Sequence, residues 1–320
     1  MFATQKLLTK LIAIISIFAI ILLFIAASKE KVVGLDFYRT PNPFSFRAKQ
    51  HLTAKLDHAE KLWKQSVDSR KEMVAASGSR AFPDDYIYPF NVWDFARPSF
   101  FCPHDLERVG SLGDGGKVVC GMSRYELASP GPSSESNPAE ELIVYSFGVS
   151  DDSSFEADML KRTNAVIWGY DFSVDSWTKD IPQHQLSRAS FHKVAIGKTT
   201  NKAKGPPFYT LQDLMKENGH SYVDLVKMDI EGAEYDAMTS LISSLLEHNT
   251  GGNNHTLPFG QILMEIHLSS GEHDFSVPND ISSWINWWES MEKLGLRPVN
   301  NEDNWVGDVV YGKPRFMEVR

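Results

Sequence analysis

Short apolar runs alternate with amphipathic segments through the second half of the chain. The apolar runs are rich in β-branched and aromatic residues, have the length of β-strands and cover residues 142–147, 165–170, 191–196, 223–228 and 261–267. Segments with a helical spacing of apolar positions stand between them, at residues 155–162, 211–218 and 233–247. Alternation of this kind is typical of an α/β domain in which helices flank a mostly parallel sheet.

The C-terminal region has a different pattern. Residues 281–294 read as a Trp-rich amphipathic helix. Val299 and residues 306–319 predict a closing antiparallel hairpin. We therefore place one catalytic-sized domain at residues 141–320.

The N-terminus begins with an apolar segment. Residues 11–27 contain Ser16 as their only polar member, close to the roughly 17 to 25 residues that span a bilayer as a helix. Residues 1–31 are predicted to be a transmembrane signal anchor, with a cleaved signal peptide as the alternative.

Two further regions separate this anchor from the domain. Residues 32–80 are predicted to be a stem, in which residues 45–76 have the spacing of an amphipathic helix. Residues 81–140 are predicted to be an accessory region and linker, with a hairpin turn at residues 113–116.

The net charge bears on which partners the protein can bind, and the cysteines and a glycosylation sequon bear on the compartment in which it folds. The chain has 32 basic and 41 acidic residues, a net charge of −9, which argues against nucleic acid as a partner. Cys102 and Cys120 are the only cysteines and could form one bridge in an oxidising compartment. Asn254 begins an Asn-His-Thr glycosylation sequon. We expect a single-pass membrane protein with its domain in the lumen of the endoplasmic reticulum or Golgi, or a secreted protein if the N-terminal segment is cleaved.

One strand-like run ends in a group of acids. Residues 223–228 lead directly into Asp229, Glu231 and Glu234, with a Gly-Ala pair between the last two. In an open α/β sheet the ligand crevice lies beyond the carboxyl ends of the strands, so Lys227, Asp229 and Glu231 are candidates for chemistry. The alternative is that Asp229 and Glu231 only cap a helix N-terminus, where carboxylates are favoured.

The order VDLVKMDIEGAE at residues 223–234 resembles the signature of FkbM-type S-adenosylmethionine-dependent methyltransferases. Residues 210–214 and 194–197 resemble two further segments of that family, in the expected order. The resemblance covers residues 142–268. It implies a Rossmann-like class I methyltransferase with a seven-stranded sheet, S-adenosyl-L-methionine as cofactor, and a small-molecule or glycan hydroxyl as acceptor.

The resemblance also implies a set of cofactor-binding residues. The loop after the first strand keeps one glycine of the usual several, and an acid follows the next strand, where it would accept hydrogen bonds from the ribose hydroxyls. The residues predicted to bind the cofactor are Gly148, Ser150, Asp171, Phe172, Ala195 and Asp229. Asp171 could instead serve only an Asx turn.

Methyl transfer to a hydroxyl needs an aligned nucleophile and a group that removes its proton. Glu265 and His267 alternate on one strand, so both side chains point to one face. The predicted catalytic residues are Asp229, Glu231, Glu265 and His267, with His267 favoured as the general base because of its ordinary pKa. No metal is predicted.

Two other functional classes remain open. A luminal glycosyltransferase shares the plan of anchor, stem and domain, but the chain lacks the Asp-x-Asp triplet that binds a nucleotide-sugar metal. A non-catalytic binding protein with the methyltransferase fold would explain the single glycine after the first strand. The oligomeric state is not predicted.

Overall fold

The computed structural model describes residues 43–77, 92–128, 141–248, 256–268, 275–304 and 316–319. The chain forms two compact units, Met1–Ala54 and Lys55–Arg320, and the contacts described below lie within the second. The predicted anchor at residues 11–27 and the sequon at Asn254 lie outside the described residues. Within the described ranges, no helix is both long enough and apolar enough to cross a membrane.

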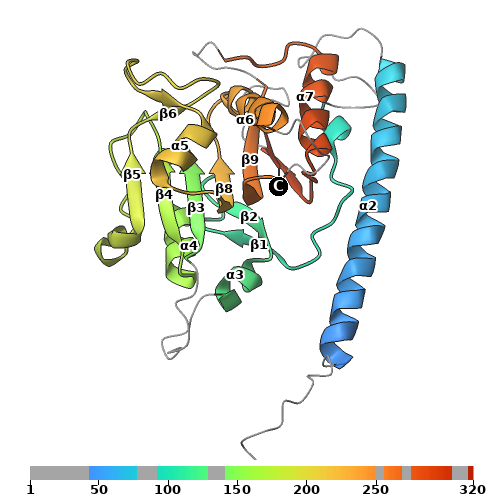
Figure 1. The fold of residues 1–320 in the computed structure, drawn as a ribbon, viewed down its shortest axis with the longest axis horizontal. Coiled ribbons are helices and arrows are strands. Elements are labelled where there is room, and N and C mark those ends of the chain that lie inside the picture. Colours follow the sequence, from blue (N-terminus) through green and yellow to red (C-terminus); the bar gives the residue numbers. More distant parts are fainter. Residues whose placement is uncertain are drawn as a thin grey trace, which may run out of the picture. The chain divides into compact units, whose positions relative to one another are not determined.

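A seven-stranded sheet carries the fold (Figure 1). Its strands are β3 (Ile143–Phe147), β4 (Val166–Tyr170), β5 (Ala189–His192), β8 (Val223–Met228), β9 (Phe259–His267), β10 (Asn301–Asp303) and β11 (Phe316–Val319). They are arranged in the order β10-β11-β9-β8-β3-β4-β5. The strands from β9 to β5 pair in parallel, whereas β11 is antiparallel to both of its neighbours. The chain passes from β3 to β4 on one side and later returns to β8 on the other, which creates a topological switch point between β3 and β8.

Helices cover both faces of this sheet, as the predicted α/β class requires. The core of one face is formed with α4 (Ser154–Arg162), and Val144 of β3 points into it. The core of the other face is formed with α5 (Leu211–Asn218), α6 (Glu234–His248) and α7 (Ile281–Lys293), and Tyr145 points there. Because successive strand residues point to opposite faces, a strand buried on both sides reads as a continuous apolar run.

Local capping explains why α5 matches its predicted range. The Thr210 side chain accepts a hydrogen bond from the backbone N–H of Asp213 at 3.1 Å. Gly219, at φ +75°, ends the helix in the left-handed conformation that glycine tolerates.

The single strand predicted at residues 191–196 is wrong. β5 ends at His192, and the backbone N–H of Val194 donates to the carbonyl of His192 at 2.9 Å. This tight turn takes the chain away from β4. The next residues form β6 (Ala195–Ile196), which pairs with β7 (Phe208–Tyr209) in a separate two-stranded sheet.

A hairpin and a disulfide precede the main sheet. β1 (Leu106–Val109) and β2 (Lys117–Cys120) form the predicted hairpin, and Cys102 is joined to Cys120 by a disulfide. The Gln261 side chain of β9 exchanges two hydrogen bonds with the backbone of Cys120, at 2.9 and 3.1 Å. The hairpin is thereby fixed against the sheet.

Four shorter or outer helices complete the described chain. They are α2 (Pro43–Ser77), η1 (Val92–Ala96), α3 (Met122–Ala128) and η2 (Gln183–Arg188). On α2, the buried Arg70 pairs with Glu292 of α7, and Trp63 donates to the same carboxylate at 3.0 Å. The predicted amphipathic helix therefore packs on the domain through its residues beyond Lys55.

Candidate active site

A cavity of about 800 Å³ lies at the carboxyl ends of β3, β4, β8 and β9, at the switch point. Every residue predicted to be catalytic or to bind the cofactor lines it: Gly148, Ser150, Asp171, Phe172, Ala195, Asp229, Glu231, Glu265 and His267. Their roles stay predictions, but the structure brings all of them to one crevice.

Glycine is required at position 148, where the loop after β3 packs against the residue that follows β8. The φ of Gly148 is +76°, and a Cβ at this position would lie 1.7 Å from the backbone carbonyl oxygen of Asp229. No other residue can adopt this approach without displacing the backbone. The single glycine of the loop therefore has a packing reason to be there.

The Asp171 carboxylate organises the loop after β3. One of its oxygens accepts hydrogen bonds from the backbone N–H groups of Val149 and Ser150, at 2.8 and 2.9 Å. The other accepts from the backbone N–H and the hydroxyl of Ser173, both at 2.7 Å. Burial would raise the pKa of Asp171, but these hydrogen bonds, led by that from the Ser173 hydroxyl, lower it. The Asx-turn alternative is thus present, and each carboxylate oxygen already accepts two hydrogen bonds.

The other predicted cofactor residues lie around this loop in different settings. Ser150 is exposed and has a left-handed backbone, with φ +49°. Ala195 is buried at the start of β6. Phe172 follows Asp171 beyond the end of β4, beside Tyr170, whose ring stacks on Phe147 with 5.0 Å between centroids.

Lys117 is a buried cation at the centre of the acidic end of the crevice. Its Nζ lies 3.0 Å from Asp229 Oδ2 and 3.7 Å from a Glu265 oxygen, and it pairs most closely with Glu318. Burial opposes its charge, but Asp229, Glu318 and Glu265 together raise its pKa. In turn, burial would raise the pKa of Asp229, but Lys117, followed by His267 and Lys227, holds it well below its usual range. Asp229 is thus an ionised carboxylate, with a side chain 23% exposed.

Lys227 forms a second buried cation behind Gly148. Its Nζ donates to the Gly148 carbonyl at 3.0 Å and pairs with Glu156 of α4 at 3.2 Å. Glu156 also accepts a hydrogen bond from the Ser146 hydroxyl at 2.5 Å. The lysine of the VDLVKMD segment therefore supports the loop from behind.

His267 is fixed by a carboxylate and faces two others. Its Nδ1 lies 2.8 Å from the buried Glu234, while Nε2 lies 3.6 Å from Glu231 and 3.9 Å from Asp229. Burial would lower the pKa of His267, but the charge of Glu234, its hydrogen bond and the neighbouring acids raise it to about 10. The imidazole is therefore protonated at neutral pH, which conflicts with the expectation that an ordinary pKa would make it the base.

Glu265 has the opposite perturbation. Burial, together with the charges of Asp229 and Glu318, raises its pKa to about 8, even though Lys117 and His267 oppose this. Glu265 Oε2 faces Lys117, and Glu265 Oε1 accepts a hydrogen bond from the Asn304 amide at 2.9 Å. At neutral pH most of its population carries a proton.

Asp229, Glu231 and His267 each offer one ligand atom, and these atoms lie within 4.8 Å of one another. A divalent cation could use such oxygen and imidazole donors only if Nε2 had lost its proton. Since the imidazole already supplies positive charge between the two carboxylates, the arrangement does not require a metal.

Reasoning from the sequence missed three members of the site: Lys117, Glu234 as the partner of His267, and Glu318. Lys117 follows a Gly-rich turn and belongs to a strand that pairs outside the main sheet, so no periodicity connected it with Asp229. Its signal was a lysine at the start of an otherwise apolar strand.

The strand order and the crevice at the switch point define an α/β protein of the Rossmann-like methyltransferase type. A family described as a methyltransferase domain matches residues 56–306, and the chain belongs to this methyltransferase family.

Two relatives carry similar descriptions. The chain is similar to "Probable methyltransferase-like protein 24" of Rattus norvegicus, with 30% identity over 185 residues, which is 55% of this chain and 44% of that protein. It is similar to the Homo sapiens protein of the same description, with 30% identity over 163 residues, or 48% of this chain and 40% of that protein. The chain therefore spans less than half the length of these curated relatives.

Proposed function

We propose that this protein is an S-adenosyl-L-methionine-dependent methyltransferase that acts on an oxygen acceptor. The observation that carries the proposal is the convergence of all predicted cofactor and catalytic residues on one 800 Å³ cavity at the switch point. Membership of a methyltransferase family supports the reaction class. The FkbM-type signature at residues 223–234 supports the narrower assignment to that type.

The residues present fit the cofactor. Val194 and Ile196 offer an apolar surface, Tyr170 and Phe172 offer aromatic surface, and the acidic end of the cavity suits a positively charged sulfonium. The close approach at Gly148 keeps the loop backbone at the floor of the cavity. When bound, the cofactor supplies a methyl group on sulfur that an aligned nucleophile can attack.

Among the four predicted catalytic residues, Glu231 is the best proton acceptor. His267 already carries a proton, Asp229 is paired with Lys117, and Glu265 is buried beside that same lysine. Glu231 is 74% exposed at its side chain and faces the imidazolium at 3.6 Å. Its backbone has φ +56°, a left-handed conformation that is rare for a residue other than glycine and that occurs often at functional sites.

The proposed roles follow from these contacts. The Asp229 carboxylate, which Lys117 holds through Oδ2, would place negative charge against the sulfonium of the cofactor at the acidic end of the cavity. Glu231 would accept the hydrogen bond of the acceptor hydroxyl and orient it, and would take its proton as the oxygen–methyl bond replaces the sulfur–methyl bond; the exposed carboxyl would then release the proton to solvent. The positive charge of His267 helps to keep Asp229 ionised, and its Nε2 faces the Glu231 carboxylate at 3.6 Å.

Transfer of a tritiated methyl group from S-adenosylmethionine to a panel of glycans and small hydroxyl compounds tests the proposal. Wild type should label at least one acceptor, and Glu231→Gln should lower kcat about a hundredfold or more. Glu247→Gln, an exposed acid at the end of α6, is the matched control and should leave kcat unchanged. Cofactor binding without transfer to any acceptor would favour the non-catalytic alternative, and sugar-nucleotide hydrolysis would favour the glycosyltransferase.

We further propose that the domain lies in the lumen of the secretory pathway, held to the membrane by residues 1–31, and that a glycan hydroxyl is the acceptor. The Cys102–Cys120 disulfide supports an oxidising compartment. In cells, a mass shift that is sensitive to endoglycosidase and lost in Asn254→Gln would place this part of the chain in the lumen. A chain that reacts fully with thiol reagents in unreduced extracts would contradict the proposed compartment.

A further inference from the structure

A second cavity of about 430 Å³ lies at the other end of β9, away from the methyl-transfer crevice. Its size falls within the range of about 300 to 1,000 Å³ that is typical of small-molecule sites. Gln261 lines this cavity and His267, six positions further along β9, lines the crevice, which corresponds to about 20 Å of strand. Where the two linings meet, the consecutive residues Met264 and Glu265 point to opposite faces of the sheet, Met264 to the cavity and Glu265 to the crevice. Among the residues that the structure describes, none lines both cavities, so the second cavity is a separate site.

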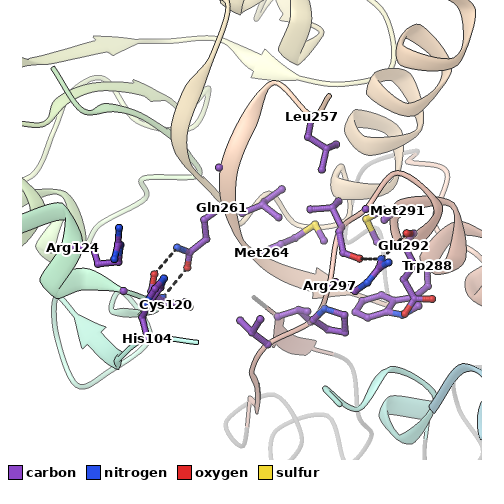
Figure 2. A pocket seen from close by; sticks show the side chains of 18 of the residues that line it. His104, Cys120, Arg124, Leu257, Gln261, Met264, Trp288, Met291, Glu292 and Arg297 are labelled. Carbon is purple, nitrogen blue, oxygen red and sulfur yellow. Dashed lines mark hydrogen bonds between the residues drawn. The ribbon is translucent and has the colours of Figure 1, made fainter. Parts of the chain in front are cut away.

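One side of this cavity is apolar. Figure 2 shows Met264 of β9 together with Met291 and Trp288 of α7 on this side. Ile262, Leu296 and Val319 extend the same surface. Met and Trp side chains adapt to aliphatic or aromatic groups, and burial of such groups is favoured by roughly 25 cal/mol per Å².

Arg124 and His104 lie on the opposite side (Figure 2). Arg124 of α3 and His104 approach each other across Gly121, where a Cβ would lie 3.6 Å from Arg124 Cδ and 3.3 Å from the His104 ring. Arg124 is exposed, and it has no side-chain hydrogen bond or ion pair among the described residues. The backbone of Cys120 and the Gln261 amide complete this polar side.

The other charged groups in the lining are already compensated. Glu292 pairs with Arg70 and accepts hydrogen bonds from Trp63 and Trp288, both at 3.0 Å. Arg297 pairs with Glu60 at 2.9 and 3.0 Å and donates to two backbone carbonyls. Arg124 is therefore the guanidinium in this cavity that remains available to a ligand, in a chain whose net charge is −9.

We propose that this cavity binds an amphipathic anion, with its apolar body against Met264, Met291 and Trp288 and its anionic head at Arg124. A guanidinium binds carboxylate and phosphate oxygens through charge-assisted hydrogen bonds, and the Met and Trp side chains cover the apolar body of the ligand. The same chemistry is found in a free fatty acid and in an anionic lipid of a bilayer.

Photo-crosslinking of the full chain in phosphatidylcholine nanodiscs tests this site. A decanoic acid that carries a diazirine should label peptides containing residues 257–264 and 288–299. Excess decanoate should compete about tenfold or more better than decanol, because the alcohol cannot form the charge-assisted hydrogen bond to Arg124. Arg124→Gln should reduce labelling by about tenfold, whereas Arg97→Gln, an exposed arginine paired with Asp94, should not.

A second variant guards against a purely electrostatic effect at the surface. Leu257→Asn places an uncharged polar amide on the apolar lining and should abolish labelling, whereas Leu246→Asn, at an exposed position of α6, should not. Labelling by a diazirine-bearing phosphatidic acid in the nanodisc would identify a bilayer lipid as the source, and labelling by the free acid alone would identify a soluble anion. Equal competition by decanol, or labelling that Arg124→Gln leaves unchanged, would overturn the proposal.

Discussion

Replacement of Lys117 by methionine tests the charge balance of the crevice most severely. Lys117 is fully buried and lies against Asp229, Glu265 and Glu318. Methionine keeps much of the side-chain volume but removes the positive charge. Asp229 and Glu318 then share the acidic end of the site without their common cation.

The expected loss of stability is large. Removing one partner of a buried ion pair typically costs about 3–5 kcal/mol, because the remaining charge is left uncompensated. At 1.4 kcal/mol per factor of ten, this corresponds to a change of about one hundredfold to several thousandfold in the unfolding equilibrium. The loss should be smaller at pH 5 than at pH 7.5. Without Lys117 the carboxyl groups have higher pKa values, and at acid pH they take up protons and become neutral.

Urea unfolding followed by tryptophan fluorescence measures this difference, with Lys193→Met as the control. Lys193 pairs with Asp175 at the surface, where both side chains are at least half exposed. An exposed pair of this kind contributes about 0–1 kcal/mol. A loss in Lys117→Met below about 1 kcal/mol at pH 7.5, or a loss that is as large at pH 5, would refute the assignment of Lys117 as the common cation of the site.

Three further outcomes are expected. Folding raises the pKa of His267 from 6.5 to about 10 and that of Glu265 from 4.5 to about 8. Each proton is therefore bound more tightly in the folded state and stabilises it, and this stabilisation is lost as pH rises through the folded-state pKa. The melting temperature should therefore fall as pH rises, from about 4.5 to 8 because of Glu265 and from about 6.5 to 10 because of His267, and the second part of the fall should be less steep in His267→Gln. A flat wild-type profile would contradict these shifts. In Asp171→Asn an amide NH₂ replaces an oxygen that accepts two hydrogen bonds, so calorimetry should find about 1–3 kcal/mol less stability together with weaker cofactor binding. If Asp171 served only the ribose, stability would be unchanged. Methyl transfer should be unaffected by dialysis against a chelator, because the His267 imidazolium supplies the positive charge between Asp229 and Glu231; loss of transfer that is restored by one added divalent metal would contradict this.

Much of the sheet could be predicted because burial imposes a period on the sequence. β8 and α5 begin and end at the predicted residues. Polar or turn-forming residues on either side of each element mark where its apolar pattern stops. One strand was predicted at residues 191–196 because residues typical of strands stand on both sides of the tight turn, Phe191 before it and Val194 and Ile196 after it. Hydrophobicity alone does not show that the residues before the turn pair with β4 and those after it with β7.

The predicted members of the site lie together because they follow strands that end at one edge. Their protonation could not be predicted in this way. The charge state of His267 depends on Glu234, which is a neighbour in space, and that of Asp229 depends on Lys117 from a separate hairpin. Ion pairs between distant segments leave no periodic signal in a single sequence.

Binding of S-adenosyl-L-methionine to the purified full chain, measured by isothermal titration calorimetry, tests the central claim most directly. We predict saturable binding with one site per chain for wild type. Binding should be lost in Gly148→Ala, whose added Cβ would meet the Asp229 carbonyl oxygen at 1.7 Å, and kept in Gly205→Ala, where a Cβ meets no atom within 4 Å. Failure of the folded wild type to bind the cofactor, or unchanged binding in Gly148→Ala, would contradict the assignment of this crevice as a methyl-transfer site.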